Sequence, residues 1–558
     1  MNNVNNSNGK SVKKVLIAGA WPYANGSLHI GHIAALLPGD VIARYHRAAG
    51  NEVYYVSGSD CHGTPVAIRA KQEGKSPQEI SDFYHNEFSD TFEKLGFSYD
   101  QYGKTSSREH IDYVRSFHEK LYENDRFVYE KTTPQAHCLS CDEPLADRMV
   151  IGRCPHCGES ARGDQCDACE AVLEPEDLLF PHCASCGERP EFRREKHLYI
   201  AISKLERELQ EFLSAHENWR KNAIAFTKRY IDEGLRDRAL TRALSWGIDV
   251  PKDGYEDKKI YIWAENVLGY LSMSKAVAER ENRDFGALWK GENALHYYVH
   301  GKDNIPFHSI ILPSLLIAHG DGWRLPDVFV SSEYMTLEGR RISTSQNWAI
   351  WAKDIASAQD PDSIRYYFII NGPEKRDGDF SWREYVNSHN GELLGAYGNF
   401  VNRSLVFVHK YLGGRVPEGK LDERMERKIS VAFCRAGKSL EAGACKDALE
   451  EIFALVRAGN KYFDDAAPWR TRESDIADCK NAIFNCVQII AALALLLEPF
   501  LPFSSRKIKF WLKLEGGWKA PHVECGRAIE PVEVLFKRLD RTSNDDVNPG
   551  RPWENKNE

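Results

Sequence analysis

The chain has 558 residues, which is too many for one hydrophobic core and predicts about three to four domains. Hydrophobic residues make up 42% and charged residues 28%, and no run approaches the roughly 18 apolar residues that a membrane helix needs. The net charge of -8 excludes a globally basic nucleic-acid binder, so any polyanion must be held by local basic patches. We therefore expect a soluble multi-domain protein with no membrane partner.

The first stretch, MNNVNNSNGKSVKK, has no apolar segment after its lysines, which predicts a disordered leader and a cytoplasmic location. KKVLIAGA is then a short apolar run typical of a buried strand, and WPYANGSLHIGH is a loop before the helical pattern IAALLPGDVIARYHRAAG. NEVYYVSGSD supplies a second strand, so the chain opens with a βαβ unit of a parallel sheet. Ligands of such sheets bind at the carboxyl ends of the strands, which makes the first loop the expected ligand site.

That loop ends in HIGH, which places His29 and His32 three residues apart where the helix begins. Free N–H groups at a helix N-terminus suit phosphates, and Gly26 and Gly31 leave room for a ligand near the backbone. Histidine donates hydrogen bonds without a fixed charge that would bind the ground state too tightly. On these residues alone, a pair of ordinary surface histidines is the more common explanation.

Eight of the fourteen cysteines fall into four CxxC pairs between Cys138 and Cys186: CLSC, CPHC, CDAC and CASC. Two such pairs complete the tetrahedral sulfur shell of one zinc, so eight cysteines predict two sites. With no position left for water, both sites should be structural; disulfides and iron–sulfur ligation are the alternatives. The scattered cysteines should pack as small apolar residues, namely Cys61, Cys434, Cys445, Cys479, Cys486 and Cys525.

After the cysteines, KKIYIWAENVLGYL and ALHYYVHGKD again resemble strands, which predicts a sheet interrupted by an insertion and then completed. From about residue 386 the pattern becomes helical, as in CKDALEEIFALVRAGNKYFDD. The expected fold class is α/β, a Rossmann-type parallel sheet split by a cysteine-rich insertion and followed by an all-α bundle. We expect a leader (1–13), a first sheet half (14–120), the insertion (121–250, cysteines at 138–186), a second sheet half (251–330), a linking region (331–385), the bundle (386–545) and a disordered tail (546–558).

The stretch AWPYANGSLHIGH resembles the first signature of class I aminoacyl-tRNA synthetases, and of the methionyl-tRNA synthetase family in particular. The segments SGSDCHGTP, YIWAENVLGY, HGKDNIPFHSIILP, DPDSIRYYFI, GNFVNR and DDAAPW resemble further parts of that family in order, so the resemblance covers about residues 14 to 540. The insertion resembles the two-knuckle form found in part of the family. The resemblance implies one zinc on Cys154, Cys157, Cys166 and Cys169, which leaves Cys138, Cys141, Cys183 and Cys186 for the other.

The second signature of class I enzymes, normally KMSKS, is matched by RISTS at 341–345. Arg341 keeps a cation at the first lysine position, but Thr344 replaces the second lysine, which the family uses to neutralise the triphosphate. A transition-state contact of this kind is worth a few kcal/mol. Arg340, Mg2+ or the hydroxyls of Ser343, Thr344 and Ser345 are candidate substitutes. We expect activity to be retained, because the rest of the site matches; loss of activation is the alternative.

The resemblance also implies a methionine pocket. Asp60 matches the residue that holds the amino-acid ammonium, and Arg242 matches an arginine near the active-site carboxylate. The remaining pocket positions are Trp21, Tyr23, Trp263, Tyr270, Phe307 and His308, whose aromatic rings suit a thioether. Taken singly, each of these aromatics is also compatible with a plain core position. The expected ATP contacts are His29, Gly31, His32, Gly301, Asp303, Arg341 and Thr344. Departures from the family pattern at Trp21, Asn266, Val267 and Asn304 leave the shape of the pocket open.

In the helical region, Trp469 is the expected platform for stacking an unpaired base, with Asn399 and Arg403 four residues apart on one helix face. These residues match the anticodon-reading positions of the family, whereas a solvated polar face is the alternative. The chain ends soon after LFKRLDR without an appended dimerisation module, which predicts a monomer. The implied partners are tRNA(Met), L-methionine and ATP with Mg2+.

The implied reaction has two steps at one site: the methionine carboxylate attacks the α-phosphate of ATP, and the terminal ribose of the tRNA then takes the aminoacyl group. Two other functions remain open. One is a paralogue that uses this chemistry in a biosynthetic or resistance role. The other is a non-catalytic tRNA-binding protein.

Overall fold

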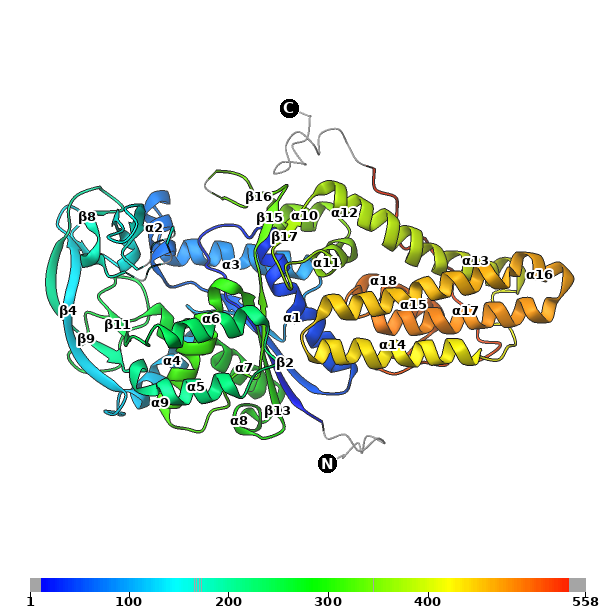
Figure 1. Cartoon of the computed structure of the whole chain (residues 1–558), viewed down its shortest axis with the longest axis horizontal. Helices are drawn as coiled ribbons and strands as arrows, with labels where there is room; N and C mark the ends of the chain where they lie inside the picture. The colour runs from blue at the N-terminus through cyan, green and yellow to red at the C-terminus, as the bar shows by residue number, and fades with distance from the viewer. Residues whose placement is uncertain are drawn as a thin grey trace.

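The computed structural model describes residues 12–540, apart from residues 165, 167, 170, 172 and 345. Ser345, one of the predicted catalytic residues, lies outside the described residues, as do the predicted tail and most of the predicted leader. The molecule is elongated, with the sheet and the insertion at one end and a bundle of long helices at the other (Figure 1).

A five-stranded sheet lies at the centre of the N-terminal part, in the order β14-β13-β1-β2-β3, and every neighbouring pair is parallel. Strands from both sides of the insertion therefore share one sheet, which confirms the predicted split. The order reverses between β1 and β13, where α/β sheets open a crevice at their carboxyl ends. The bounds are β1 Lys14–Gly19, β2 Glu52–Ser59, β3 Gln101–Lys104, β13 Ala294–Gly301 and β14 Val328–Ser332.

Both faces of this sheet are buried, as the continuous apolar runs predicted. Along β1, Val15 and Ile17 join the core under α1, which continues into the helical bundle, while Leu16 and Ala18 join the core under α7. The helices of this part are α1 Ile30–Ala48, α2 Thr64–Glu73, α3 Pro77–Lys94, α4 Arg108–Leu121, α7 Gly269–Glu281, α8 Phe285–Lys290 and α9 Leu312–His319.

The insertion stands on a long antiparallel pair, β4 (Val128–Cys138) with β9 (Glu191–Ile200), which forms the outer edge of the molecule in Figure 1. β5 and β10 extend this pair to a four-stranded sheet, and a three-stranded sheet in the order β7-β6-β8 lies at its tip. The bounds are β5 Glu143–Pro144, β6 Val150–Arg153, β7 Ser160–Arg162, β8 Leu179–Cys183 and β10 Arg238–Ala239; helices α5 (Glu206–Ser214) and α6 (Lys221–Asp232) lie between β9 and β10.

The strand predicted from KKIYIWAENVLGYL is wrong for most of its length. After the short β12 (Lys259–Ile260), which pairs with β11 (Thr241–Arg242), the chain forms two 3-10 turns, η4 (Ile262–Ala264) and η5 (Asn266–Leu268), before α7. Glu265, between the two turns, is fully buried. Aromatic and β-branched residues favour a strand locally, but tertiary contacts override that preference here.

A small sheet in the order β16-β15-β17 connects the two ends of the molecule. It holds β15 Met335–Leu337, β16 Arg340–Arg341 and β17 Gly378–Phe380, and α10 Ala352–Ala358, α11 Pro361–Ile370 and α12 Trp382–Ser388 surround it. β15 and β16 form a hairpin whose two turn residues, Glu338 and Gly339, both have positive φ, as a tight hairpin turn requires.

The C-terminal part is helical, as predicted, with α13 Asn399–Tyr411, α14 Glu423–Glu441, α15 Cys445–Ala466, α16 Pro468–Ser474, α17 Ile476–Leu497 and α18 Pro502–Leu512. Figure 1 shows the longer helices running side by side along the axis of the molecule. Among the described residues, α17 alone is long and apolar enough to cross a membrane, with a mean hydropathy of 1.7, but 89% of its apolar window is buried inside the bundle.

Candidate active site

A cleft of about 510 Å3 opens at the carboxyl ends of β1 and β13, where the strand order reverses. The loop after β1, the first turn of α1, the end of β13 and the β15–β16 hairpin form its walls. The predicted residues that it brings together are Trp21, Tyr23, His29, Gly31, His32, Gly301, Asp303 and Arg341. Thr344 is exposed and does not line this cleft among the described residues.

The two histidines cap α1 reciprocally. The backbone N–H of Gly31 donates to Nδ1 of His29 at 3.1 Å, and the backbone N–H of His29 donates to Nδ1 of His32 at 3.1 Å. A neutral imidazole carries one proton, so a ring whose Nδ1 accepts a hydrogen bond is protonated at Nε2. Both rings therefore present Nε2–H donors at the N-terminus of a helix, which is a favourable place for an anion.

Both rings are neutral at pH 7. Burial, and to a smaller extent repulsion by a charge on His32, holds the pKa of His29 well below its usual value. Burial also lowers the pKa of His32 to about 4. Their donor roles are therefore independent of pH in the physiological range. Ordinary surface histidines, the more common explanation of the motif taken alone, would not have this arrangement.

The first turn of α1 is held by the chain that follows the second signature. Ile30 N–H donates to the Ile350 carbonyl at 3.0 Å, and Ala352 N–H donates to the Leu28 carbonyl at 2.7 Å. Gly31 is required here because a Cβ at this position would lie 2.8 Å from Cε1 of His29. The two signature segments are thus one continuous hydrogen-bonded unit.

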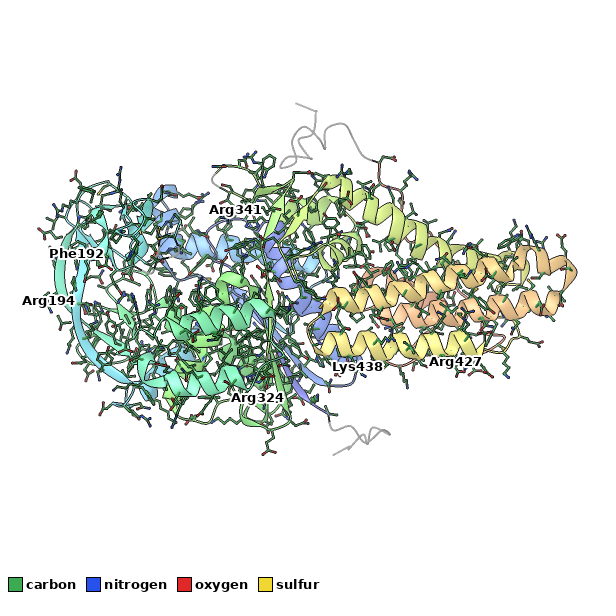
Figure 2. All side chains as sticks on the ribbon, in the orientation of Figure 1. Phe192, Arg194, Arg324, Arg341, Arg427 and Lys438 are labelled. Carbon is green, nitrogen blue, oxygen red and sulfur yellow. The ribbon has the colours of Figure 1, made fainter. Side chains whose placement is uncertain are left out.

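Arg340 and Arg341 point to opposite sides of the β15–β16 hairpin, as successive strand residues do. Arg341 lines the cleft, with its guanidinium 5.9 Å from the ring of Tyr334, and Figure 2 places it at the upper rim of the molecule. Arg340 lies instead over the ring of Trp348 at 4.3 Å. Ser343 and Trp348 exchange two backbone hydrogen bonds, each 2.9 Å long.

Four of the predicted thioether residues do not line the cleft, namely Trp263, Tyr270, Phe307 and His308. Tyr270 and His308 are buried, and the Tyr270 hydroxyl lies 2.8 Å from Nε2 of His308, whose Nδ1 lies 2.8 Å from the Asn304 carbonyl. A carbonyl only accepts, so His308 is protonated at Nδ1 and accepts at Nε2 from Tyr270. Trp263 and Phe307 pack edge to face at 5.1 Å and are half-buried.

Asp60 is fully buried at the end of β2 and is bonded through its backbone to the loop after β1. Its N–H donates to the Pro22 carbonyl at 2.8 Å, and its carbonyl accepts from Ala24 N–H at 2.9 Å. Burial, and then the nearby carboxylate of Glu265, raise the pKa of Asp60 to about 8. Asp60, the expected ammonium acceptor, also forms a parallel bridge with Tyr23.

Sequence reasoning missed a second buried acid in this region. Glu265 is fully buried, and its Oε1 lies 2.5 Å from Nδ1 of His62. Burial alone would lower the pKa of His62, but the Glu265 carboxylate outweighs that effect and raises it. Glu265 follows Trp263 and Ala264 in an apolar segment, and an acid in such a segment is a sequence signal for a buried functional carboxylate. Only the fold brings it within reach of His62, 203 residues away.

Arg242 pairs with an acid from the insertion rather than lining the cleft. Its Nη2 donates to Oδ2 of Asp147 at 3.1 Å, and its guanidinium lies 5.0 Å from the ring of Tyr261. Burial opposes the charge, but Asp147 outweighs it and raises the pKa of Arg242. The pair lies within the insertion, and this part of the insertion is close to Tyr23, since Arg148 beside Asp147 is near enough to influence the pKa of Tyr23.

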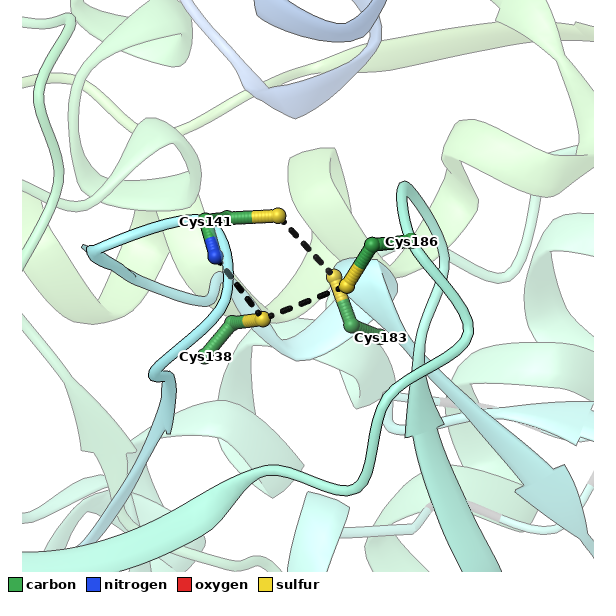
Figure 3. Close-up of side chains that lie close together, drawn as sticks. All are labelled: Cys138, Cys141, Cys183 and Cys186. Atoms are coloured by element: carbon green, nitrogen blue, oxygen red, sulfur yellow. Dashed lines mark hydrogen bonds between the residues drawn. The ribbon is translucent and has the colours of Figure 1, made fainter.

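The eight predicted metal-ligating cysteines form two groups of four, Cys138–Cys141–Cys183–Cys186 and Cys154–Cys157–Cys166–Cys169, in which all sulfur atoms lie within 4.8 Å of one another. This is the grouping that the resemblance implied. Figure 3 shows the first group, with the Cys138 and Cys186 sulfurs 3.4 Å apart and the Cys141 and Cys183 sulfurs 4.0 Å apart.

These distances suit a tetrahedral ion. With zinc–sulfur bonds of about 2.3 Å, the edges of a regular tetrahedron are about 3.8 Å long. In the second group the sulfurs of Cys154 and Cys169 are 3.7 Å apart, and those of Cys157 and Cys166 are 3.6 Å apart. All eight cysteines are free thiols, so the disulfide alternative is not realised in this structure.

The predicted anticodon residues meet at the far end of the bundle. Trp469 is 45% exposed and lies 5.6 Å from the ring of Phe463, over which the guanidinium of Arg403 lies at 4.2 Å. Arg403 also donates to Asp464 at 2.6 Å and to Asn460 at 3.0 Å. Asn399 is exposed one turn before Arg403 on the same helix.

The fold and its cleft place the chain among class I aminoacyl-tRNA synthetases, because the two signature segments meet at the open end of the split parallel sheet. The family model described as tRNA synthetases class I (M) matches residues 15–405, and the anticodon binding domain of methionyl tRNA ligase matches residues 413–549. The chain therefore belongs to the methionyl-tRNA synthetase family.

Curated relatives cover almost the whole chain. The chain is 52% identical over 530 residues to methionine–tRNA ligase 1 of Alkaliphilus oremlandii and to methionine–tRNA ligase 2 of Bacillus anthracis, covering 94% of this chain and 97% of each relative. Among solved structures, Mycobacterium tuberculosis methionyl-tRNA synthetase bound by methionyl-adenylate superposes with a TM-score of 0.78 at 22% identity. That match covers 94% of this chain and 100% of the other, and it confirms the fold.

Proposed function

We propose that the chain activates L-methionine with ATP to form methionyl-adenylate and then transfers the methionyl group to tRNA(Met). The observation that carries this proposal is the pair of neutral histidines, each protonated at Nε2, at the start of α1 and in the same cleft as Tyr23. Asp60, next to Tyr23, supplies the carboxylate for the amino-acid ammonium.

In the first step, a carboxylate oxygen of methionine attacks the α-phosphorus of ATP and pyrophosphate leaves. Negative charge increases on the phosphate oxygens, where the Nε2–H groups of His29 and His32 and the cation of Arg341 stabilise it. Gly301, which has open space where a Cβ would stand, and Asp303 contact the ribose. In the second step, a ribose hydroxyl of the terminal adenosine attacks the carbonyl of the mixed anhydride and AMP leaves.

Two kinds of metal ion belong to this proposal. Mg2+ enters with ATP and neutralises part of the triphosphate charge. Zinc is held by the two groups of four cysteines, where it has no free coordination position and stabilises the tip of the insertion. Trp469, Asn399 and Arg403 read unpaired bases of the anticodon by stacking and edge hydrogen bonds.

We also propose that the protein works as a monomer in the cytoplasm. Sedimentation at micromolar concentration gives the oligomeric state directly. Relatives numbered 1 and 2 favour a second candidate, a specialised second copy of the enzyme. Complementation of a strain that lacks its housekeeping enzyme tests the first role: growth shows that the chain can replace that enzyme, whereas exchange activity without growth favours a specialised second copy.

The test of the proposed function is methionine-dependent exchange of pyrophosphate into ATP, measured for wild type and for Arg341→Ala. We expect exchange by the wild type and a loss of about a hundredfold in the variant, since its cation lines the cleft. Binding of tRNA(Met) without exchange by the wild type would instead identify a non-catalytic RNA-binding protein.

A further inference from the structure

Several buried polar atoms around Asp60 have no hydrogen-bond partner among the described residues. They come from four different segments: the loop after β1, the residue that follows β2, the start of α4, and the turns η4 and η5 before α7. The atoms are Nε1 of Trp21, Oδ1 of Asp60, Nε2 of His110, Oε2 of Glu265 and Oδ1 of Asn266. Buried polar groups are normally paired, so a cluster of orphaned atoms indicates a place where a polar ligand or water belongs.

Four of these five atoms are acceptors. The Ser272 hydroxyl donates to the Gly269 carbonyl at 3.2 Å, so Ser272 accepts from Nδ1 of His110 at 2.9 Å. Burial lowers the pKa of His110 to about 3, which leaves its Nε2 as a bare lone pair. A set of acceptors with one donor is complementary to a primary ammonium, which donates three hydrogen bonds.

Within this set of residues, Asn266 is the one whose side chain donates a hydrogen bond to Asp60. Its Nδ2 donates to Oδ2 of Asp60 at 3.0 Å, and no other side chain among the described residues hydrogen-bonds to that carboxylate. Its Oδ1 is buried and orphaned, like Oδ1 of Asp60. The amide thus holds one oxygen of Asp60 and leaves two acceptors, one from each residue, for a ligand.

The adjacent residue explains why this contact matters. Glu265 is buried next to Asn266 in the chain, and its carboxylate favours the protonated form of Asp60. A protonated Asp60 would lose the charge that attracts an ammonium. The Asn266 N–H bond acts in the opposite direction, because it favours the ionised carboxylate and lowers the pKa of Asp60.

We propose that Asn266 is a positioning residue for the ammonium of the amino-acid substrate, which orients Asp60 and contributes its own amide oxygen to the same ammonium. This inference rests on the proposed function and adds a residue that the sequence marked only as a departure. The other titratable groups that face Asp60 are Tyr23 from the loop after β1, Cys61 and His62 after β2, Glu265 before η5, and Tyr270 from α7.

The test compares wild type with Asn266→Ala. The affinity for L-methionine is measured by calorimetry without ATP, and KM and kcat by pyrophosphate exchange. We expect Kd and KM for methionine to rise about tenfold, the effect of losing a hydrogen bond to a charged group, with kcat and KM for ATP within about twofold. Asn293→Ala is the matched control, because Asn293 lies at the amino end of β13 and bonds to the Val12 carbonyl.

Two further measurements exclude a merely structural role. Desamino-methionine, the same acid without its amino group, should inhibit both proteins within about twofold of each other, since the contact concerns the ammonium. Methionine affinity should fall on the acid side as Asp60 takes up a proton. The pH at which half of this affinity is lost should be higher in Asn266→Ala than in wild type, because Asp60 then keeps its proton to a higher pH.

Equal weakening of methionine and desamino-methionine, an unshifted pH profile, or an unchanged Kd for methionine would each overturn the proposal. Failure of the proposed function has a different result: the wild type then shows no methionine-dependent exchange. The calorimetric comparison does not depend on ATP, so it tests Asn266 in that case as well.

Discussion

Arg365 donates to Oδ2 of Asp40 at 2.6 Å, and both side chains are completely buried. Asp40 lies in α1, the helix that begins at the two histidines, and Arg365 lies in α11 beside the helical bundle. The guanidinium also donates to the carbonyls of Pro499 and Phe500, just before α18. The helix that begins at the two histidines is therefore bonded directly to the C-terminal part of the molecule.

Arg365→Met should lower the free energy of unfolding by about 3 kcal/mol, because it removes the fully buried one of the two arginines that pair with the Asp40 carboxylate. Urea denaturation measures this change. The double variant Asp40→Leu with Arg365→Met should be less destabilised than the single one, since the buried carboxylate is then gone and the partly exposed Arg44 keeps its bond to the Gly96 carbonyl. Equal stability of Arg365→Met and wild type would show that the pair contributes nothing.

The same pair has a defined pH dependence. Burial opposes ionisation of Asp40, but Arg365 and Arg44 outweigh it and lower the pKa of Asp40 to about 2. A folded-state pKa below the unfolded value of about 3.9 means that the stabilisation is complete above pH 4 and is lost as pH falls toward 2. Asp40→Asn should therefore lose stability at pH 7 but flatten the acid limb of the stability profile, which thermal melts between pH 2.5 and 7 would resolve.

Gly31→Ala should reduce the rate of pyrophosphate exchange by at least about tenfold, because its Cβ would lie 2.8 Å from the His29 ring and displace it. Methionine binding by calorimetry should be unchanged, since the amino-acid residues lie elsewhere in the cleft. Gly26→Ala, in the same loop, is the matched control: its Cβ would meet nothing within 4 Å. Similar losses in both variants would mean that the loop, rather than the His29 ring, is sensitive.

Local spacing made part of this site predictable from the sequence. The histidines of HIGH and the cysteine pairs are a few residues apart, so short-range geometry brings each set together wherever the segment lies. The pairing of Asp40 with Arg365 and of Asp60 with Asn266 spans 325 and 206 residues, and only the complete fold creates it.

The turn region between β12 and α7 shows a second limit of structure prediction from the sequence. Its aromatic residues have a strong local preference for a strand, but the chain forms two 3-10 turns there, in which Trp263 packs on Phe307 and Asn266 bonds to Asp60. The sequence assigns Arg341 to the first lysine position and leaves Arg340 as one substitute for the second, and in the hairpin Arg341 rather than Arg340 lines the cleft.

Zinc content tests the grouping of the cysteines. We expect two zinc ions per wild-type chain, and one in Cys138→Ser or in Cys154→Ser, because each variant breaks a different group of four. Cys138→Ser combined with Cys186→Ser should keep one ion, whereas Cys138→Ser combined with Cys154→Ser should keep none. Atomic emission on dialysed protein gives these ratios, and loss of both ions from a single substitution would contradict two independent sites.

Trp469→Ala should raise KM for tRNA(Met) by about tenfold or more, since stacking of one base contributes about 1 to 3 kcal/mol. Trp469→Phe keeps an aromatic face and should lose much less. Pyrophosphate exchange needs no tRNA and should be the same in all three proteins, because Trp469 lies in the helical bundle, outside the residues that line the cleft. A variant that loses exchange and aminoacylation together would indicate disruption of the fold rather than of RNA recognition.

Restoring the missing lysine is the sharpest test of the altered second signature. Thr344→Lys should raise kcat for pyrophosphate exchange by about tenfold or more if the closing loop brings position 344 to the triphosphate. Thr344→Ser, which keeps the hydroxyl without adding charge, should leave kcat within about twofold. Arg340→Ala should also have little effect, because its guanidinium lies over Trp348 on the side of the hairpin away from the cleft. A large loss in Arg340→Ala, with no gain in Thr344→Lys, would instead mean that Arg340 leaves Trp348 during the reaction and supplies the charge that the lysine supplies in relatives.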